Sequence, residues 1–91
     1  RKDDYLARFG GEEFVLLMMA SGLAAARTSC DRLRKCVEEL RIDELGPQRV
    51  TVSIGGSFYR PQDTPGSLLE RADNAMYRAK TNGRNRTELA T

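Results

Sequence analysis

The chain contains no histidine, and its two cysteines do not form a CxxC pair. Structural zinc sites are built from such residues, so the sequence has no zinc-site pattern. Cys30 and Cys36 lie in a helical pattern, about 600° of helix rotation apart, so they face different directions and are not expected to form a disulfide. Two unpaired, partly buried cysteines are typical of a reducing cytosol, and we expect a cytoplasmic protein.

Long apolar runs are also absent, since no stretch approaches the about 20 residues that a membrane helix needs. The charged start at residues 1–4 has no apolar segment behind it, so we identify no signal peptide. We expect no membrane contact by this segment, which does not preclude an anchor elsewhere in a longer protein. The chain does not begin with methionine, and we expect it to be a piece of such a protein.

A strong excess of one charge is lacking as well. The 15 basic and 13 acidic residues leave a net charge of +2, which is too even to indicate binding to nucleic acid or to an anionic membrane. What is present is an ordinary globular composition, with 40% hydrophobic residues in 91. A chain of this length can form one small domain around a single core, with little margin.

Two short apolar runs near the start are joined by glycines. The runs cover residues 5–9 and 14–19, with Gly10 and Gly11 between them. Glycine adopts the positive φ of a tight turn at little cost, so this pattern predicts a β-hairpin. The second run is apolar on both faces, which indicates a strand covered on both sides. A helix is the alternative for six apolar residues, and the adjacent glycines and the short length favour a strand.

Two helices and two further strands follow in the pattern. Apolar residues at alternating spacings of three and four predict a helix with a single apolar stripe. These residues are Leu23, Ala26, Cys30, Leu33, Val37 and Leu40. Strand periodicity then covers residues 50–58, where Gly55-Gly56 indicates a bulge or a close backbone approach.

The second helix has start and stop signals of its own. Thr64 can cap it with Pro65 at its first position, and Gly83 suits the left-handed position that ends it. A last short strand is predicted within residues 86–90. The resulting order, β-β-α-β-α-β, predicts an α+β or α/β layer of sheet and helices.

Five sequence blocks carry more information than the periodicity. They are RF at 8–9, GGEEF at 10–14, TVSIG at 51–55, ADNAMYRAK at 72–80 and GRNR at 83–86. A single short motif would be weak, but five in this order resemble the GGDEF domains of diguanylate cyclases over nearly the whole chain. The resemblance implies an α+β, palm-like fold, similar to ferredoxin-like and nucleotidyl-cyclase domains, with a sheet flanked by helices. Residues 1–91 would form the C-terminal part of that domain, without its N-terminal strand and helices.

The resemblance also implies an activity. Such domains condense two GTP into cyclic di-GMP, with each 3′-hydroxyl attacking the α-phosphate of the GTP on the other subunit of a homodimer. This chemistry requires a divalent metal, expected to be Mg²⁺ or Mn²⁺, which carboxylate oxygens bind well.

The GGEEF block carries the catalytic expectations. In relatives the position of Glu12 binds metal and that of Glu13 is needed for turnover, while Gly10 and Gly11 let the backbone approach the nucleotide. On a regular strand Glu12 and Glu13 would point to opposite faces. Two glutamates alone would indicate only a solvated hairpin tip, and the other blocks reverse that preference.

Two cations are expected at the end of the last long helix. In relatives, residues at the positions of Lys80 and Arg84 bind the triphosphate of GTP, which suits a lysine and an arginine. They would equally complement the dipole at a helix C-terminus, and both roles can hold together. We interpret Asp73 as structural, Tyr77 as packing and Arg86 as a surface residue.

Arg1 and Asp4 form an RxxD sequence five residues before Gly10. In many members of the family an RxxD at this distance is an inhibitory site for the product, cyclic di-GMP. The arginine would pair with a phosphate or a guanine edge, and the aspartate would accept hydrogen bonds from guanine.

The family's first strand, with an aspartate metal ligand, and its guanine-recognising helix have no counterpart in this sequence. We therefore expect the isolated segment to be inactive, and to expose strand edges or pair them with another copy. One alternative is a non-catalytic domain that binds cyclic di-GMP through Arg1 and Asp4; another is a dimerising module without nucleotide affinity. The intact GGEEF favours the cyclase.

Overall fold

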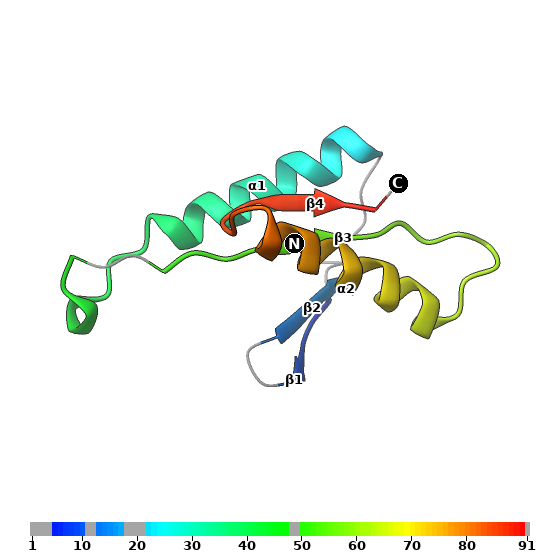
Figure 1. Cartoon of the computed structure of the whole chain (residues 1–91), viewed down its shortest axis with the longest axis horizontal. Helices are drawn as coiled ribbons and strands as arrows, with labels where there is room; N and C mark the ends of the chain where they lie inside the picture. Colours follow the sequence, from blue (N-terminus) through cyan, green and yellow to red (C-terminus); the bar gives the residue numbers. More distant parts are fainter. Residues whose placement is uncertain (1–4, 11–12, 18–21, 48–49, 91) are drawn as a thin grey trace.

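The structure is a computed structural model that describes residues 5–10, 13–17, 22–47 and 50–90. The elements, shown in Figure 1, are β1 (Tyr5–Gly10), β2 (Glu13–Leu17), α1 (Leu23–Glu38), a short 3-10 helix η1 (Asp43–Leu45), β3 (Ile54–Gly56), α2 (Pro65–Thr81) and β4 (Thr87–Leu89). This order confirms the predicted β-β-α-β-α-β, with η1 added.

Within these described residues, no helix has both the length and the apolar character needed to cross a membrane.

The described strands form two separate two-stranded sheets. β1 and β2 are an antiparallel hairpin in which Tyr5 lies opposite Leu17, and β3 and β4 are parallel, with Ile54 opposite Thr87. In Figure 1 the hairpin projects away from the β3–β4 pair. Each of these strands has one hydrogen-bonded neighbour among the described strands, so both sheets have open edges, in line with the unpaired edges expected from the sequence.

Helix α2 begins and ends as its sequence predicts. The Thr64 hydroxyl accepts a hydrogen bond from the Ser67 backbone N–H at 3.1 Å, while the Ser67 hydroxyl accepts one from the Thr64 N–H, also at 3.1 Å. This reciprocal capping box satisfies two backbone donors that the helix leaves free, and Pro65 occupies the first turn. At the other end Gly83 has φ +126°, the left-handed conformation expected after a helix.

The core lies where α2 packs on β3 and β4. Ala75 and Ala79 are fully buried, at 0% exposure, because small side chains let the helix approach the strands closely. Gly55 makes that approach possible: a Cβ there would overlap the Met76 backbone nitrogen and the Ala72 carbonyl oxygen. The predicted close backbone approach at this glycine is confirmed.

Strand β3 is shorter than the alternation over residues 50–58 predicts. Its partner β4 begins opposite Ile54, so the residues before Ile54 have no strand beside them in the described chain. After Gly56 the chain forms a hydrogen bond with α2: the Ser57 hydroxyl donates to the Leu68 carbonyl at 2.7 Å. Strand periodicity therefore overestimated the paired length.

Helix α1 contacts β4, and its apolar stripe is only partly covered. Ala26 and Cys30 are buried, whereas Leu23, Leu33 and Leu40 are about half exposed. The predicted apolar stripe is therefore exposed in part at these three leucines, and Leu40 lies beyond the end of the helix at Glu38. Cys36 is exposed while Cys30 is buried, which confirms that the two cysteines face different directions.

Candidate functional site

The GGEEF block lies at the β1–β2 hairpin. Gly10 is the last residue of β1 and is paired with Glu13, the first residue of β2, with an irregular register between Arg8 and Gly10. The predicted hairpin is thus present, with its connection at Gly11 and Glu12 rather than at Gly10 and Gly11. Those two connecting residues lie outside the described part of the chain. The hairpin places Glu13 at the start of a strand, directly after the predicted metal ligand.

The expected product site lies at the opposite end of β1. Arg1 and Asp4 are outside the described residues, and the strand begins at the next residue, Tyr5. Since β1 runs from there to Gly10, the whole length of the strand separates the RxxD sequence from the GGEEF block.

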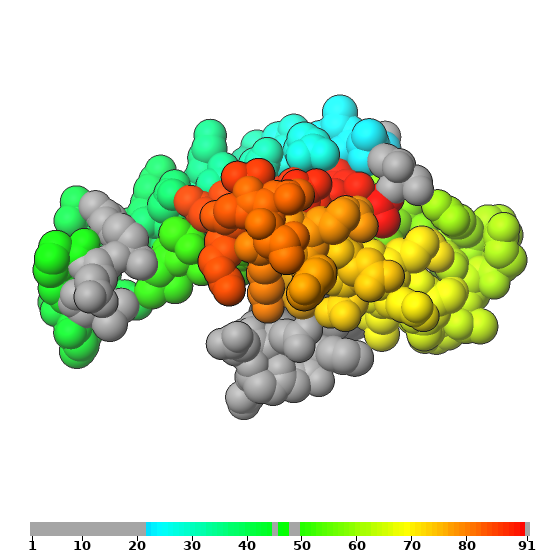
Figure 2. All heavy atoms as spheres, in the orientation of Figure 1, coloured from blue at the N-terminus to red at the C-terminus, as the bar shows by residue number. Residues whose placement is uncertain are grey.

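The two predicted phosphate-binding cations lie together at the C-terminal end of α2. Lys80 is in the last turn of the helix and half-buried, and Arg84 is exposed in the turn that follows. The Arg84 backbone N–H donates to the Ala79 carbonyl at 2.8 Å, which folds the chain back over the helix end. In Figure 2 the orange atoms of this region lie at the surface, next to the red atoms of β4.

The backbone of this turn is unusual. Gly83, Arg84 and Asn85 are consecutive residues with positive φ, at 126°, 61° and 45°. Positive φ disfavours most side chains, and asparagine tolerates it better than arginine does. Sequence reasoning identified the glycine as the helix stop but missed the left-handed arginine and the role of Asn85, because their conformation depends on contacts with distant elements.

Asn85 joins the turn to two other parts of the fold. Its side-chain oxygen accepts a hydrogen bond from Arg34 Nη1 at 3.0 Å, and its side-chain nitrogen donates to the carboxylate of Glu38. Its backbone N–H donates to the Ser53 hydroxyl at 3.2 Å. The end of α2 is thereby bound to α1 and to the segment that leads into β3.

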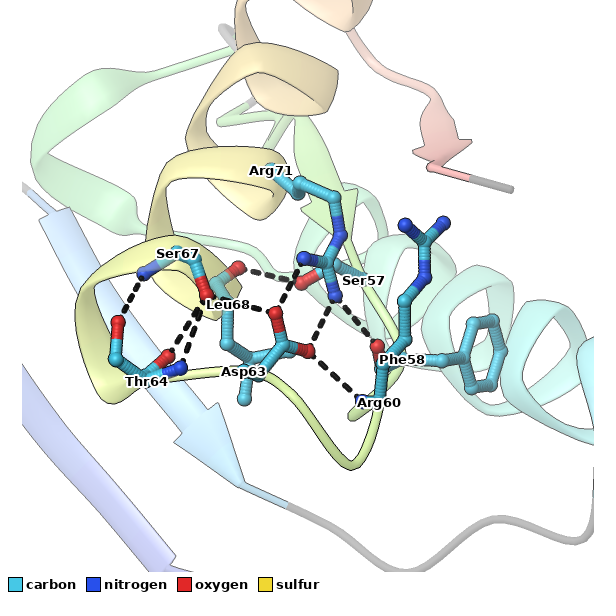
Figure 3. A network of polar contacts seen from close by, with 8 residues as sticks. All are labelled: Ser57, Phe58, Arg60, Asp63, Thr64, Ser67, Leu68 and Arg71. Atoms are coloured by element: carbon cyan, nitrogen blue, oxygen red, sulfur yellow. Dashed lines mark hydrogen bonds and ion pairs between the residues drawn. The ribbon is translucent and has the colours of Figure 1, made fainter.

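A second polar network lies at the other end of α2 (Figure 3). The Asp63 carboxylate accepts hydrogen bonds from Arg71 Nη1 at 2.6 Å and Nη2 at 2.7 Å, from the Ser67 hydroxyl at 2.7 Å and from the Arg60 backbone N–H at 2.8 Å. Arg71 also donates to the Phe58 carbonyl at 2.8 Å.

These contacts determine the charge state of the network. The hydrogen bonds from Arg71, followed by that from Ser67, hold the pKa of Asp63 well below its usual range. The Asp63 side chain is only 4% exposed, so every one of its acceptor sites is used within the fold. We assign this network to the structure of the loop before α2 rather than to a site.

The buried cysteine, Cys30, is a core residue of α1. Burial, and to a smaller extent the Asp31 carboxylate, raise the pKa of the Cys30 thiol, while Arg27 acts in the opposite direction. A neutral thiol is a poor nucleophile, so Cys30 is a small apolar core residue, as expected.

Asp73, Tyr77 and Arg86 are all exposed in the structure. Asp73 is exposed and its side chain has no hydrogen-bond partner among the described residues, so the structure gives no support to a structural bond there. Tyr77 is 68% exposed, which contradicts its interpretation as a packing residue. Arg86 is exposed, as expected, and its Nε donates to the Arg84 carbonyl at 3.3 Å.

The predicted metal ligand, Glu12, lies outside the described residues. Over the described ranges, no group of three or more cysteine, aspartate or glutamate side chains is arranged to hold a metal ion. The carboxylates at residues 12 and 13 are hard oxygen donors, the kind that Mg²⁺ and Mn²⁺ prefer, so the donor chemistry fits a divalent metal at this position.

Comparison with known proteins connects this arrangement to one family. The family profile described as Diguanylate cyclase, GGDEF domain, matches residues 1–86. Diguanylate cyclase A of Treponema denticola is 44% identical over 92 residues, covering 99% of this chain and 25% of that protein. Diguanylate cyclase DgcP of Pseudomonas aeruginosa is 42% identical over 91 residues, covering 99% of this chain and 14% of that protein. The chain therefore spans a quarter or less of these relatives.

Solved structures agree with the sequence relatives. The GGDEF domain of DgcB from Caulobacter crescentus, in complex with c-di-GMP, has a TM-score of 0.86 at 30% identity, covering 98% of this chain and 54% of that one. Diguanylate cyclase SiaD from Pseudomonas aeruginosa, in complex with its activator SiaC, has a TM-score of 0.81 at 34% identity, covering 99% of this chain and 35% of that one. These likenesses agree with the expected α+β, palm-like fold. The chain belongs to the diguanylate cyclase GGDEF domain family.

Proposed function

We propose that the protein carrying this chain is a diguanylate cyclase, in which residues 1–91 form the C-terminal part of the catalytic domain. The observation that carries this proposal is the intact GGEEF block at the tip of a hairpin, in a chain related over 99% of its length to proteins named diguanylate cyclases. A domain that only binds nucleotide has no need of both acidic residues. The expected reaction takes place in the cytoplasm and joins two GTP.

In this reaction, the 3′-oxygen of each GTP forms a bond to the α-phosphorus of the other. Each 3′-hydroxyl gives up its proton, and each bond between an α- and a β-phosphate breaks, so that two GTP give one cyclic di-GMP and two pyrophosphates. Each half of the site holds one GTP, so two copies of the domain must face each other.

The hairpin supplies the acidic groups. Glu12 would hold the divalent metal, Mg²⁺ or Mn²⁺, and Glu13 would act in turnover beside it. When bound, the metal supplies positive charge that activates the hydroxyl and neutralises charge on the phosphates. Gly10 and Gly11 carry no Cβ, which lets the nucleotide lie close to the backbone.

The end of α2 supplies the cations. Lys80 and Arg84 would bind the triphosphate, with the lysine acting as a compact charge and the arginine as a planar donor of paired hydrogen bonds. Their place at a helix C-terminus is also favourable without ligand, because cations complement the negative end of the helix dipole. The two roles differ in what they predict for GTP binding.

A substitution at Lys80 distinguishes these roles. In the complete protein, Lys80→Ala should raise KM for GTP, because one cation that binds the triphosphate is removed. Arg78→Ala is the matched control, since Arg78 is also basic and in the last turn of α2 but is not assigned to the ligand. Equal KM values in Lys80→Ala and the wild type would mean that Lys80 complements the helix dipole and does not bind the triphosphate.

We propose in addition that Arg1 and Asp4 form an inhibitory site for cyclic di-GMP. The solved GGDEF domain of DgcB in complex with c-di-GMP supports product binding in a relative. From Asp4 to Gly10 is about 20 Å of extended chain at about 3.3 Å per residue, so product bound there would not compete directly for GTP. Inhibition would act by coupling, holding the domains where the two GTP sites cannot meet.

Progress curves with and without added cyclic di-GMP test the inhibitory site. Arg1→Ala should relieve inhibition and leave the initial rate unchanged, with product binding weakened by roughly tenfold or more, since one charge-assisted contact is lost. Lys2→Ala is the control, because it removes a neighbouring positive charge outside the RxxD sequence. Equal inhibition of the wild type and Arg1→Ala would mean that RxxD is only a charged strand end.

A further inference from the structure

The turn that carries Arg84 holds this arginine in a backbone conformation that is uncommon for its residue type. Arg84 has φ 61° and Asn85 φ 45°, in a region where non-glycine residues are uncommon and arginine has no intrinsic preference. Such residues persist where surrounding contacts determine the backbone. The contacts at the helix end account for part of this, through the bond from the Arg84 N–H to the Ala79 carbonyl at 2.8 Å.

The remaining contacts come from Asn85. Its side-chain amide lies between two residues of α1, accepting from Arg34 at 3.0 Å and donating to Glu38. Arg34 and Glu38 are one helical turn apart, so they share a face of α1 and engage the oxygen and the nitrogen of one amide. Both bonds involve a charged partner, which makes them stronger than neutral hydrogen bonds.

This arrangement anchors the residue next to Arg84 on a separate helix. Asn85 is half-buried, whereas Arg84 is exposed and makes no side-chain hydrogen bond among the described residues. The backbone of Arg84 is therefore held from both sides, by Ala79 and by Asn85, while its guanidinium is left available.

We propose that Asn85 is a positioning residue for the phosphate-binding turn. Its side chain fixes the left-handed backbone at Arg84 and so keeps Lys80 and Arg84 together before GTP arrives. The inference rests on the proposed binding of the triphosphate by these two cations. A turn ordered in advance loses less conformational freedom on binding, and ordering one long side chain and its backbone corresponds to about a three- to tenfold change in affinity.

Two substitutions of Asn85 separate the effect of its side-chain hydrogen bonds from the effect of its backbone conformation. Asn85→Gly removes both side-chain bonds but accepts positive φ freely and keeps the backbone bond to Ser53. Asn85→Ala removes the same bonds and adds the penalty of a left-handed alanine. Ser57→Ala is the matched control, because it removes one hydrogen bond, to Leu68, at the opposite end of α2.

The measurement uses two ligands with the complete protein. One is 3′-deoxy-GTP, which carries the triphosphate but lacks the attacking hydroxyl, and the other is GMP, which lacks the β- and γ-phosphates. We expect Asn85→Gly to weaken 3′-deoxy-GTP binding by about three- to tenfold and to leave GMP binding unchanged, with Asn85→Ala equal or weaker. Ser57→Ala should change neither affinity, even if it lowers the thermal unfolding temperature as much as Asn85→Gly does.

Lys80→Ala and Arg84→Ala, run in parallel, separate this inference from the proposed function. If they weaken 3′-deoxy-GTP selectively and Asn85→Gly does not, the positioning role is wrong and the phosphate-binding role stands. Equal weakening of both ligands by Asn85→Gly would show a general structural effect and overturn the inference. If neither cation variant affects 3′-deoxy-GTP, the phosphate-binding assignment fails and the inference fails with it.

Discussion

At the scale of single residues, Gly55 determines how closely strand β3 and helix α2 approach. Gly55→Ala should destabilise the fold by about 3 kcal/mol or more, because the new methyl group overlaps backbone atoms of Met76 and Ala72, which cannot move aside as a side chain can. Gly56→Ala is the control, since its Cβ would meet only the end of the Leu89 side chain, at 2.7 Å. Urea unfolding of both variants measures the difference, and similar losses would contradict this account.

Asp63 gives the fold a defined response to acid. Its pKa in the folded state lies below the unfolded value of about 3.9, chiefly because of its hydrogen bonds from Arg71. The carboxylate therefore contributes stability that is present above about pH 4 and lost as the pH falls toward the folded-state pKa. Asp63→Asn should be less stable at pH 7 and lose less stability on acidification than the wild type.

The control for this pH dependence is Asp73→Asn, because Asp73 is an exposed carboxylate on α2, the helix that follows Asp63, with no side-chain partner among the described residues. Urea unfolding at several pH values between 7 and 2 compares the three proteins. If Asp63→Asn follows the wild-type curve, the Asp63–Arg71 network does not govern acid stability.

At the scale of elements, the structure begins α2 where the sequence predicts, with Thr64 as the N-cap and Pro65 in the first turn. Thr64→Ala should cost about 1 kcal/mol, because it removes the hydroxyl that accepts the Ser67 N–H. Thr64→Ser keeps the hydroxyl and should be close to wild type in thermal or urea unfolding. Equal stability of the two variants would mean that the capping box is not stabilising.

The same scale shows why some elements were predictable and others were not. The bounds of α2 depend on local chemistry, in Thr64, Pro65 and Gly83, and local chemistry is visible in the sequence. The length of β3 depends on where β4 lies beside it, and the exposure of Leu33 depends on what covers α1. Periodicity reports the residues that favour a strand or a buried face, but it does not report whether a partner is present.

At the scale of the whole molecule, the order of elements, the fold class and the family followed from the sequence. The sequence also predicted that Lys80 and Arg84 share one helix end, because they are four residues apart. The network around Asn85 was not predictable, since Arg34 and Glu38 are 51 and 47 residues away along the chain. Contacts of this separation are created where α1 lies beside the turn that follows α2.

The central claim is that the GGEEF hairpin makes this protein a cyclase, and Glu13→Gln tests it most directly. The complete protein is incubated with GTP and Mg²⁺, and the products are separated by chromatography. The wild type should form cyclic di-GMP, and Glu13→Gln should form at least about 100-fold less, with its unfolding free energy within about 0.5 kcal/mol. Glu44→Gln, at an exposed glutamate of η1, should retain the wild-type rate. A wild-type protein that makes no product, or a fully active Glu13→Gln variant, would contradict the account.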